Sequence, residues 1–221
     1  DGGTARQLTE GNFNHYGSLA WSSNSDQIFF SAYRSDDWEL VSDEADIYSV
    51  SIISKEIKQV TNQPGAERSP VMSPNGKLIA FSKEERRPLA YSPDRIAIMN
   101  LDGTNIRILT NDLDGDASNI LWSLDSGSLY YAYDEHGIRK IGRATIKGKL
   151  SHVIQGLGGT TLGRPYLSGG FHIANNTLVF THGTSDRPAN IALINGDQIE
   201  ILTALNDDLL SHRKLGAVNE I

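Results

Sequence analysis

A unit of about 50 residues recurs four times along the chain, and this repeat constrains the fold more than any other feature of the sequence. Each unit contains a short, mostly apolar run followed by a polar turn. The four runs are Leu19-Ala20-Trp21-Ser22, Pro70-Val71-Met72-Ser73, Ile120-Leu121-Trp122-Ser123 and Gly170-Phe171-His172-Ile173. Their anchor positions, 21, 72, 122 and 172, are 51, 50 and 50 residues apart. This period predicts that one supersecondary unit is copied along the chain.

Each unit is predicted to contain four strands. The apolar run is the first strand, and the Asn, Asp and Gly residues after it suit a hairpin turn. The second strands are expected at 27–31, 78–82, 128–132 and 178–181, and the third at 46–50, 96–99, 138–141 and 190–194. Fourth-strand motifs occur at 6–9, 58–61, 107–110, 151–154 and 200–203. Four strands per repeat are typical of a propeller blade.

The predicted fold is therefore all-β, a single β-propeller domain over residues 1–221 with about four blades of four antiparallel strands. The repeat units run approximately over 10–61, 62–110, 111–154 and 155–203. Because the chain opens and closes near fourth-strand motifs, both ends are expected to be cut from a larger protein. Four blades are close to the lower limit for a closed ring, so two arrangements stay open. One is a tight small ring, and the other is an open arc whose strand edges pair with a second copy.

Composition excludes several classes of partner. The chain has 27 acidic and 20 basic residues, a net charge of -7, so the broad attraction that drives nucleic-acid binding is missing. The absence of cysteine rules out disulfides and thiolate metal sites. The apolar runs are far shorter than the roughly 20 residues that span a bilayer, so no membrane partner is expected. The compartment stays open, with the cytoplasm favoured.

Two groups of motifs carry a family resemblance. The segment Ser73-Pro74-Asn75-Gly76-Lys77-Leu78-Ile79-Ala80-Phe81 is similar to the repeat of TolB-like propellers and of the propellers of prolyl-oligopeptidase-family serine peptidases. The later motifs resemble acylaminoacyl-peptidase-like members. They are Gly163-Arg164-Pro165-Tyr166, Gly170-Phe171, Asp186-Arg187-Pro188-Ala189, Leu202-Thr203, Asn206, Asp207-Asp208-Leu209-Leu210 and Leu215-Gly216, before Glu220-Ile221. The resemblance covers nearly all of the chain, weakly in the first 60 residues and best between 163 and 221.

The resemblance implies a non-catalytic propeller of an acylaminoacyl- or dipeptidyl-peptidase-like serine peptidase. In that family the propeller covers the active site, so this domain would limit access to short peptides and help to bind them. Hydrolysis would belong to an absent C-terminal α/β-hydrolase domain, with residues 204–221 as the junction toward it. The alternative is a TolB-like scaffold for protein–protein interaction. A third alternative, a propeller lyase or glycosidase, would need paired carboxylates or a metal cluster, which the sequence does not identify.

The sequence predicts no catalytic residue, no cofactor and no metal site. A hydrolase of the expected kind needs Gly-x-Ser-x-Gly, and no such run is present. Asp112, Asp114 and Asp116 alternate like calcium-loop ligands, but Ala117 and Ser123 replace the glycine and glutamate of that pattern. A solvated turn between blades is the better interpretation. The histidines do not show the short spacings of zinc sites and are interpreted as surface or core residues.

Three residues are candidates for substrate binding. Arg164 and Tyr166 follow the glycine-rich stretch 155–161, where a loop could present a guanidinium and a phenol to a peptide. The competing interpretation is structural, with Arg164 pairing a neighbouring acid and Tyr166 packing between blades. Trp38 stands among polar residues and is a candidate exposed contact. Trp21 and Trp122 share one repeat position, which predicts that both lie in the core between blades.

Overall fold

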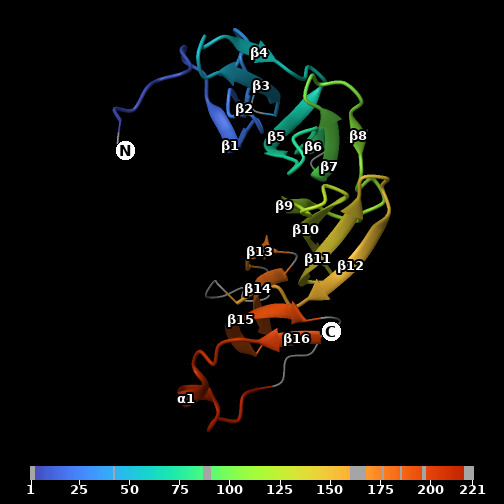
Figure 1. Ribbon diagram of the computed structural model, residues 1–221. Helices are drawn as coiled ribbons and strands as arrows, with labels where there is room; N and C mark the ends of the chain where they lie inside the picture. The colour runs from blue at the N-terminus through green and yellow to red at the C-terminus, as the bar shows by residue number, and fades with distance from the viewer. Residues whose placement is uncertain are drawn as a thin grey trace.

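The computed structural model describes residues 3–41, 43–86, 91–159, 168–175, 177–184, 186–195 and 198–216. These residues form four antiparallel sheets of four strands each, and in every sheet the strands pair in chain order. Each sheet is called a blade below, and the blades are numbered in chain order. They follow one another along an open arc (Figure 1). The predicted all-β propeller fold is confirmed, and the blades form an open arc and not a closed ring. Pairing of this arc with a second copy stays a prediction.

The strands have the following bounds. Blade 1 contains β1 (His15–Trp21), β2 (Gln27–Ala32), β3 (Asp46–Ser51) and β4 (Ile57–Gln59). Blade 2 contains β5 (Gly65–Met72), β6 (Leu78–Glu85), β7 (Arg95–Asn100) and β8 (Arg107–Ile108). Blade 3 contains β9 (Ala117–Trp122), β10 (Ser128–Glu135), β11 (Ile138–Thr145) and β12 (Leu150–Gln155). Blade 4 contains β13 (Phe171–Ala174), β14 (Thr177–Thr184), β15 (Arg187–Asn195) and β16 (Gln198–Ile201).

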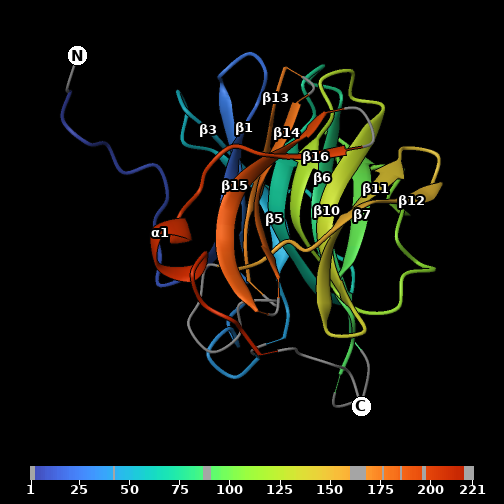
Figure 2. The ribbon, with the colours of Figure 1, turned by 90° about the horizontal axis from the view of Figure 1, so that it is seen from below.

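One short helix, α1 (Asp207–Leu210), follows blade 4 in the described part of the chain. It lies at the end of the arc beyond β15 and β16 (Figure 1). Seen at right angles to that view, most strands of the four blades run in a similar direction (Figure 2). None of the helices among the described residues is long and apolar enough to cross a membrane.

A serine closes the first turn of three blades. Ser73 Oγ donates to Asn75 Oδ1 at 2.8 Å and accepts the amide N–H of Leu78 at 2.9 Å. Ser22 and Ser123 make the same kind of bond with the first residue of the following strand, at 2.9 and 3.0 Å. The side chain thus fixes the hairpin, as short polar residues do at turns. This explains why a serine follows the anchor in these units.

A threonine ends each fourth-strand motif of blades 1, 2 and 4. Its hydroxyl oxygen accepts a hydrogen bond from a backbone N–H of the third strand in the same blade. The hydroxyl thus takes the place of a backbone carbonyl where the chain leaves the sheet. The bonds are Ile47 N to Thr61 Oγ1 at 2.9 Å, Ile96 N to Thr110 Oγ1 at 2.8 Å and Ile191 N to Thr203 Oγ1 at 2.9 Å. The repeat is therefore built into side-chain bonding as well as into apolar spacing.

The core consists of apolar layers between successive blades. Phe29 of blade 1 packs with Ile79 and Phe81 of blade 2, and all three are almost fully buried. Similar layers lie between blades 2 and 3, around Leu129, and between blades 3 and 4, around Phe180. Because strand side chains alternate, each sheet gives one face to the preceding blade and one to the following blade. Burying each such side chain stabilises the fold by about 1.5–3 kcal/mol.

The prediction for the two tryptophans is half right. Trp122 is 7% exposed, and its indole nitrogen donates to the carbonyl of Val71 in the preceding blade at 3.0 Å. Trp21 is 55% exposed, so its predicted place in the core is wrong. The reason is that this position packs on the preceding blade, and no blade precedes blade 1 in the described residues. Identical repeat positions thus have opposite environments.

The predicted anchor of the fourth unit is wrong by one residue. In blades 1 to 3 the anchor pairs with the second residue of the next strand. The pairs are Trp21 with Ile28, Met72 with Ile79, and Trp122 with Leu129. The corresponding pair in blade 4 is Ile173 with Leu178, not His172. His172 is exposed on the other side of the strand. The turn after it is also shorter, since Ala174 pairs with Thr177.

The segment at 6–9 does not form the predicted strand. Leu8 nevertheless packs against Phe30, Tyr48 and Val50 on the side of blade 1 that faces away from blade 2. Leu109 packs in the same way between blades 2 and 3. Leu8 therefore keeps its place in the repeat although its backbone lacks a strand partner among the described residues.

Candidate functional site

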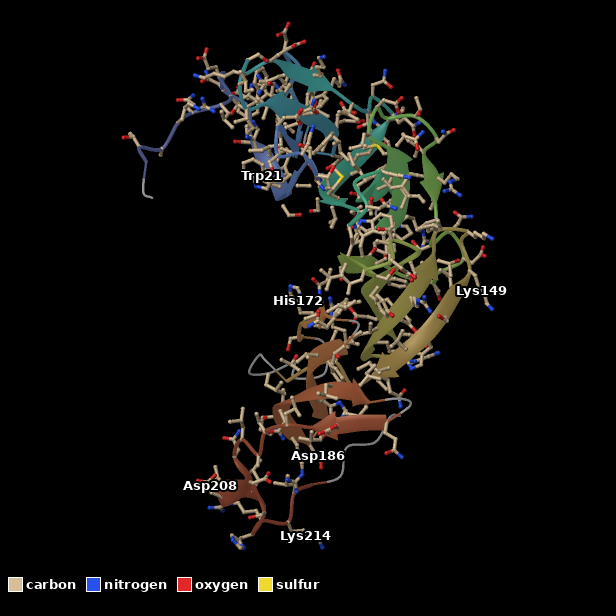
Figure 3. All side chains as sticks on the ribbon, in the orientation of Figure 1. Trp21, Lys149, His172, Asp186, Asp208 and Lys214 are labelled. Carbon is tan, nitrogen blue, oxygen red and sulfur yellow. The ribbon has the colours of Figure 1, made fainter. Side chains whose placement is uncertain are left out.

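The first strand of each blade is called its inner strand below. The inner strands of blades 1, 2 and 3, which are β1, β5 and β9, line a groove of about 670 Å³. Its wall combines apolar side chains, including Leu19 and Trp21, with polar ones, including Arg68, Asp94 and Ser118. Figure 3 shows Trp21 at one end of the concave side of the arc. Concave sites with a few polar groups among apolar ones are the usual places for ligand binding. This groove is the candidate functional site.

Backbone irregularities shape the groove. The pairing register shifts within β1, β5 and β9, and each shift accompanies a left-handed residue: Gly17 (φ 67°), Ser69 (φ 56°) and Asn119 (φ 53°). Two of these residues carry a Cβ, and such a conformation costs roughly 1–3 kcal/mol. Bulges of this kind bend a strand and redirect its side chains. Three successive inner strands therefore share one built-in distortion at the groove.

Contacts between blades hold two of these bulges. The Ser69 amide N–H donates to Ser31 Oγ of blade 1 at 3.0 Å. A Cβ on Gly17 would lie 2.3 Å from Ser69 Oγ, which is too close for any side chain. Glycine is thus required at position 17 both by its left-handed angle and by the approach of Ser69.

Charges of both signs line the groove. Arg68 lies 3.3 Å from Glu84 Oε2, and about a third of each side chain is exposed. Asp94 accepts a hydrogen bond from Ser82 Oγ at 3.0 Å, and its backbone amide donates to Asp116 Oδ1 at 2.8 Å. A partly exposed ion pair has little net strength, so the guanidinium of Arg68 can exchange Glu84 for another carboxylate. The groove can therefore interact with a positive and a negative group together.

A second group of charges is buried between blades 1 and 2. Lys83 Nζ lies 2.8 Å from Glu67 Oε1, with side chains 7% and 0% exposed. Nearby, Gln59 Nε2 donates to Asp46 Oδ2 at 2.9 Å, and the Gly65 amide donates to Glu44 Oε2 at 2.9 Å. Burial, and then the charge of Glu67, raise the pKa of Asp46 to about 7. The carboxyls of Glu44, Asp46 and Glu67 thus outnumber the one buried ammonium, that of Lys83, and Asp46 keeps its proton until the pH approaches neutral.

The candidates from the sequence fall mostly elsewhere. Arg164 and Tyr166 lie outside the described residues. Trp38 is half-buried, its ring lies edge-on to Phe13 with centroids 6.3 Å apart, and it is not among the residues that line the groove. Its role as a contact residue stays a prediction.

Sequence reasoning missed Arg68 and Asp94. Arg68 lies four residues before an anchor, so its position on an inner strand could have been inferred from the repeat. The part of the chain that the structure describes holds no group of three or more His, Cys, Asp or Glu residues that could bind a metal ion. In the segment that resembles a calcium loop, Asp116 accepts hydrogen bonds from the Tyr91 hydroxyl and the Asp94 amide.

Comparison with known proteins places the fold among propellers. The family model of the dipeptidyl peptidase IV N-terminal region matches residues 1–87 of the 221. The resemblance to propellers of this peptidase family is confirmed, although the match falls at the N-terminal part, where few of the recognised motifs lie. A search of curated proteins gave no match.

Solved structures of propellers are similar to the chain. Acylaminoacyl peptidase from Pyrococcus horikoshii has a TM-score of 0.67 at 20% identity, over 89% of this chain and 28% of that one. Oligogalacturonate lyase from Vibrio parahaemolyticus has a TM-score of 0.64 at 15% identity, over 88% and 55%. TolB from Acinetobacter baumannii has a TM-score of 0.59 at 17% identity, over 86% and 43%. The chain thus spans less than two thirds of each of these proteins, and the likeness concerns the fold.

Proposed function

We propose that this chain is a non-catalytic propeller domain that limits access to, and helps to bind, short peptides for an α/β-hydrolase peptidase domain outside it. The family match over residues 1–87 and the propeller fold support the class of protein. The observation that carries the proposal is the groove, where Arg68 and Asp94 stand beside apolar side chains.

A short peptide has the features that this groove complements. Its terminal carboxylate would take the place of Glu84 on Arg68, in a charge-assisted hydrogen bond. Its ammonium group would be drawn to Asp94, and an apolar side chain would contact Leu19. Because these contacts are few and partly exposed to water, an affinity of about millimolar is expected, which corresponds to about 4 kcal/mol.

Calorimetric titration of the chain with free and N-acetylated dipeptides tests peptide binding. Replacing Arg68 by glutamine should weaken binding of both kinds about tenfold, whereas acetylation should remove only the interaction with Asp94. Arg187→Gln is the matched control, because Arg187 is exposed on blade 4 and does not line the groove. Equal binding by the two arginine variants would contradict a role for the groove.

Peptidase assays test the proposed division of labour. The chain alone should not hydrolyse chromogenic acylated or free dipeptides, whereas a longer protein that joins it to a hydrolase domain should. In that longer protein, Arg68→Gln should raise KM with little change in kcat, because the lost interaction would bind substrate and transition state alike. Hydrolysis by the chain alone would refute the non-catalytic assignment.

A TolB-like interaction scaffold is the second candidate function. It is favoured by the exposure of Leu19 (60%) and Trp21 (55%), since exposed large apolar side chains mark protein contact sites. The two functions make different predictions in the titration. A scaffold would show no saturable binding of dipeptides, and Arg68→Gln would have no effect on them.

A further inference from the structure

A second pocket, of about 390 Å³, lies between blades 3 and 4. We call it the outer pocket. Strands β10, β11 and β12 line it on one side, and β15 and β16 line it on the other. Figure 1 shows β11 and β12 on the convex side of the arc, whereas the groove belongs to the inner strands. The outer pocket is thus separate from the groove, and its volume suits a small molecule.

The contact between blades 3 and 4 contains a charge at a position that is apolar in other blades. In blade 2, Ala80 pairs with Ile98, and both are fully buried against blade 3. The corresponding pair in blade 3 is Tyr130 with Arg143. Blade 4 has Leu193 where blade 3 has Arg143. Tyr130 and Arg143 are both half-buried, and both line the outer pocket.

The guanidinium of Arg143 is fixed at one nitrogen only. Its Nε donates to Ser128 Oγ at 2.9 Å, and Ser128 is fully buried. Its Cζ lies 5.8 Å from the centroid of the Tyr130 ring. Within the described part of the chain, neither Nη donates a hydrogen bond and no carboxylate forms an ion pair with Arg143. Because burial removes hydration that no protein group replaces here, this cation favours an added anion.

Asp125, an acid close enough to sense the charge of Arg143, is bound within its own turn. Its Oδ1 accepts hydrogen bonds from Ser123 Oγ at 2.6 Å and from the Gly127 amide at 2.9 Å. These two bonds are the largest causes that lower the pKa of Asp125, and the charge of Arg143 has a smaller effect. Asp125 therefore does not take the place of an anion on Arg143.

The remaining side chains of the outer pocket are neutral. Val153 and Ile194 pack at the edge of the apolar layer between blades 3 and 4. Ile199 lines the pocket and is 40% exposed. Ser151 and Gln198 add two exposed polar side chains. One cation, an apolar surface and two neutral polar groups together complement a small molecule with one acidic group and an apolar body.

We propose that the outer pocket binds a small organic acid, with its carboxylate on Arg143 and its apolar part against Ile194 and Ile199. A planar guanidinium offers two parallel N–H groups, which match the two oxygens of a carboxylate. Inorganic phosphate can make the same charged contact but has no apolar part, so it should bind more weakly. The proposal does not depend on peptide binding in the groove, because the two sites share no lining residue in the described structure.

Titration with phenylacetate, followed by the backbone amide signals of the isotopically labelled chain, tests the proposal. For a ligand of this size, a Kd of about 1 mM is expected. Signals of residues 151–154 and 198–199 should move, and that of Arg68 should not. Phenylacetamide, which has the same shape without the charge, should bind about tenfold more weakly or not at all. Equal binding of the amide, or shifts confined to the groove, would overturn the proposal.

Two pairs of variants locate the acid. Arg143→Gln should weaken phenylacetate binding about tenfold, whereas Arg68→Gln, in the groove, should leave it unchanged. Ile199→Glu adds a carboxylate to the pocket that competes for Arg143, so binding should be lost. Ile201→Glu is its matched control, because Ile201 is 48% exposed on the same strand and does not line the pocket.

The variants also separate this proposal from the peptide-binding function of the groove. Arg68→Gln should weaken dipeptide binding without affecting phenylacetate, so either site can fail while the other holds. Ile199 and Ile201 are both exposed, so circular dichroism of their glutamate variants should match the parent. Unchanged phenylacetate binding in Arg143→Gln and Ile199→Glu would refute the assignment. Loss of binding in Arg68→Gln or Ile201→Glu would place the acid elsewhere and refute it too.

Discussion

Replacing Asp46 with asparagine should stabilise the protein at pH 8 and leave its stability at pH 4 nearly unchanged. Asp46 is 9% exposed. Burial is the largest cause that raises its pKa from 3.8 to about 7, and the charge of Glu67 is the next. Asparagine keeps an oxygen that can accept the hydrogen bond from Gln59, but it cannot ionise. The substitution therefore removes the ionisation and little else.

The magnitude follows from the difference in pKa between folded and unfolded states. Between pH 4 and 7 the folded protein holds a proton that the unfolded chain has released, so raising the pH favours unfolding. The stabilisation is complete below the unfolded pKa of 3.8 and is lost as the pH rises through about 7. Three units at about 1.36 kcal/mol each give roughly 4 kcal/mol. Rearrangement of neighbouring groups reduces this, so a gain of about 2–4 kcal/mol is expected at pH 8.

Urea unfolding followed by circular dichroism at pH 4, 5, 6, 7 and 8, at one protein concentration, measures the effect. The difference in free energy of unfolding between Asp46→Asn and the parent should grow from pH 4 to about 7 and then level off. Asp36→Asn provides the control, because Asp36 is exposed in a loop, and its difference should stay flat. A destabilised Asp46→Asn protein at pH 8, or a difference that does not change with pH, would refute the reasoning.

Three further predictions concern packing and are measured by urea unfolding. Trp122 is 7% exposed, so Trp122→Ala leaves a cavity and should lower the free energy of unfolding by about 3–5 kcal/mol. Trp21 is 55% exposed, so Trp21→Ala should change the free energy of unfolding by less than about 0.5 kcal/mol. Gly142→Ala places a Cβ 2.5 Å from a buried tyrosine ring and should cost about 1–3 kcal/mol, while Gly170→Ala meets no atom within 4 Å and should cost less. Thr110→Val removes the hydroxyl that accepts an amide of β7 at 2.8 Å and should cost about 1–3 kcal/mol, with faster hydrogen exchange at that amide.

The blades could be predicted from the sequence because their determinants are local. Ser73 and its counterparts close hairpins with residues two to five positions away. Thr110 and its counterparts bond to a strand only 12 to 14 residues earlier. The apolar runs and turn residues are also local, and the second, third and fourth strands of all four blades lie where they predict.

Burial at the ends of the arc could not be predicted from the sequence. Trp21 and Trp122 are the same residue at the same repeat position, but only Trp122 has a preceding blade to pack on in the described structure. In blade 4, a turn of different length moves the structural anchor from His172 to Ile173. A one-residue shift exchanges the two faces of a strand, so repeat spacing alone cannot assign the faces.

The candidate groove could not be predicted from the sequence for a related reason. Its form depends on left-handed angles at Ser69 and Asn119. Asparagine adopts this conformation more readily than most residues, but serine does not, so position 69 carries no mark of it in the sequence. The bulges at these residues change which neighbouring side chains face inward. Arg68 and Asp94 therefore line the same groove through backbone geometry and packing between blades, and neither has a distinctive motif.

The buried charges between blades 1 and 2 lower the stability of the contact between these blades. Glu67 is fully buried, and its Oε2 has no hydrogen-bond partner among the described residues, although Oε1 bonds to Lys83. Breaking a buried ion pair is strongly destabilising, by about 3–5 kcal/mol, while an intact pair adds little to stability. The apolar layer around Phe29 and Phe81 must offset the cost of burying these charges. We therefore expect the contact between blades 1 and 2 to be the first to loosen when the pH rises through the pKa of Asp46.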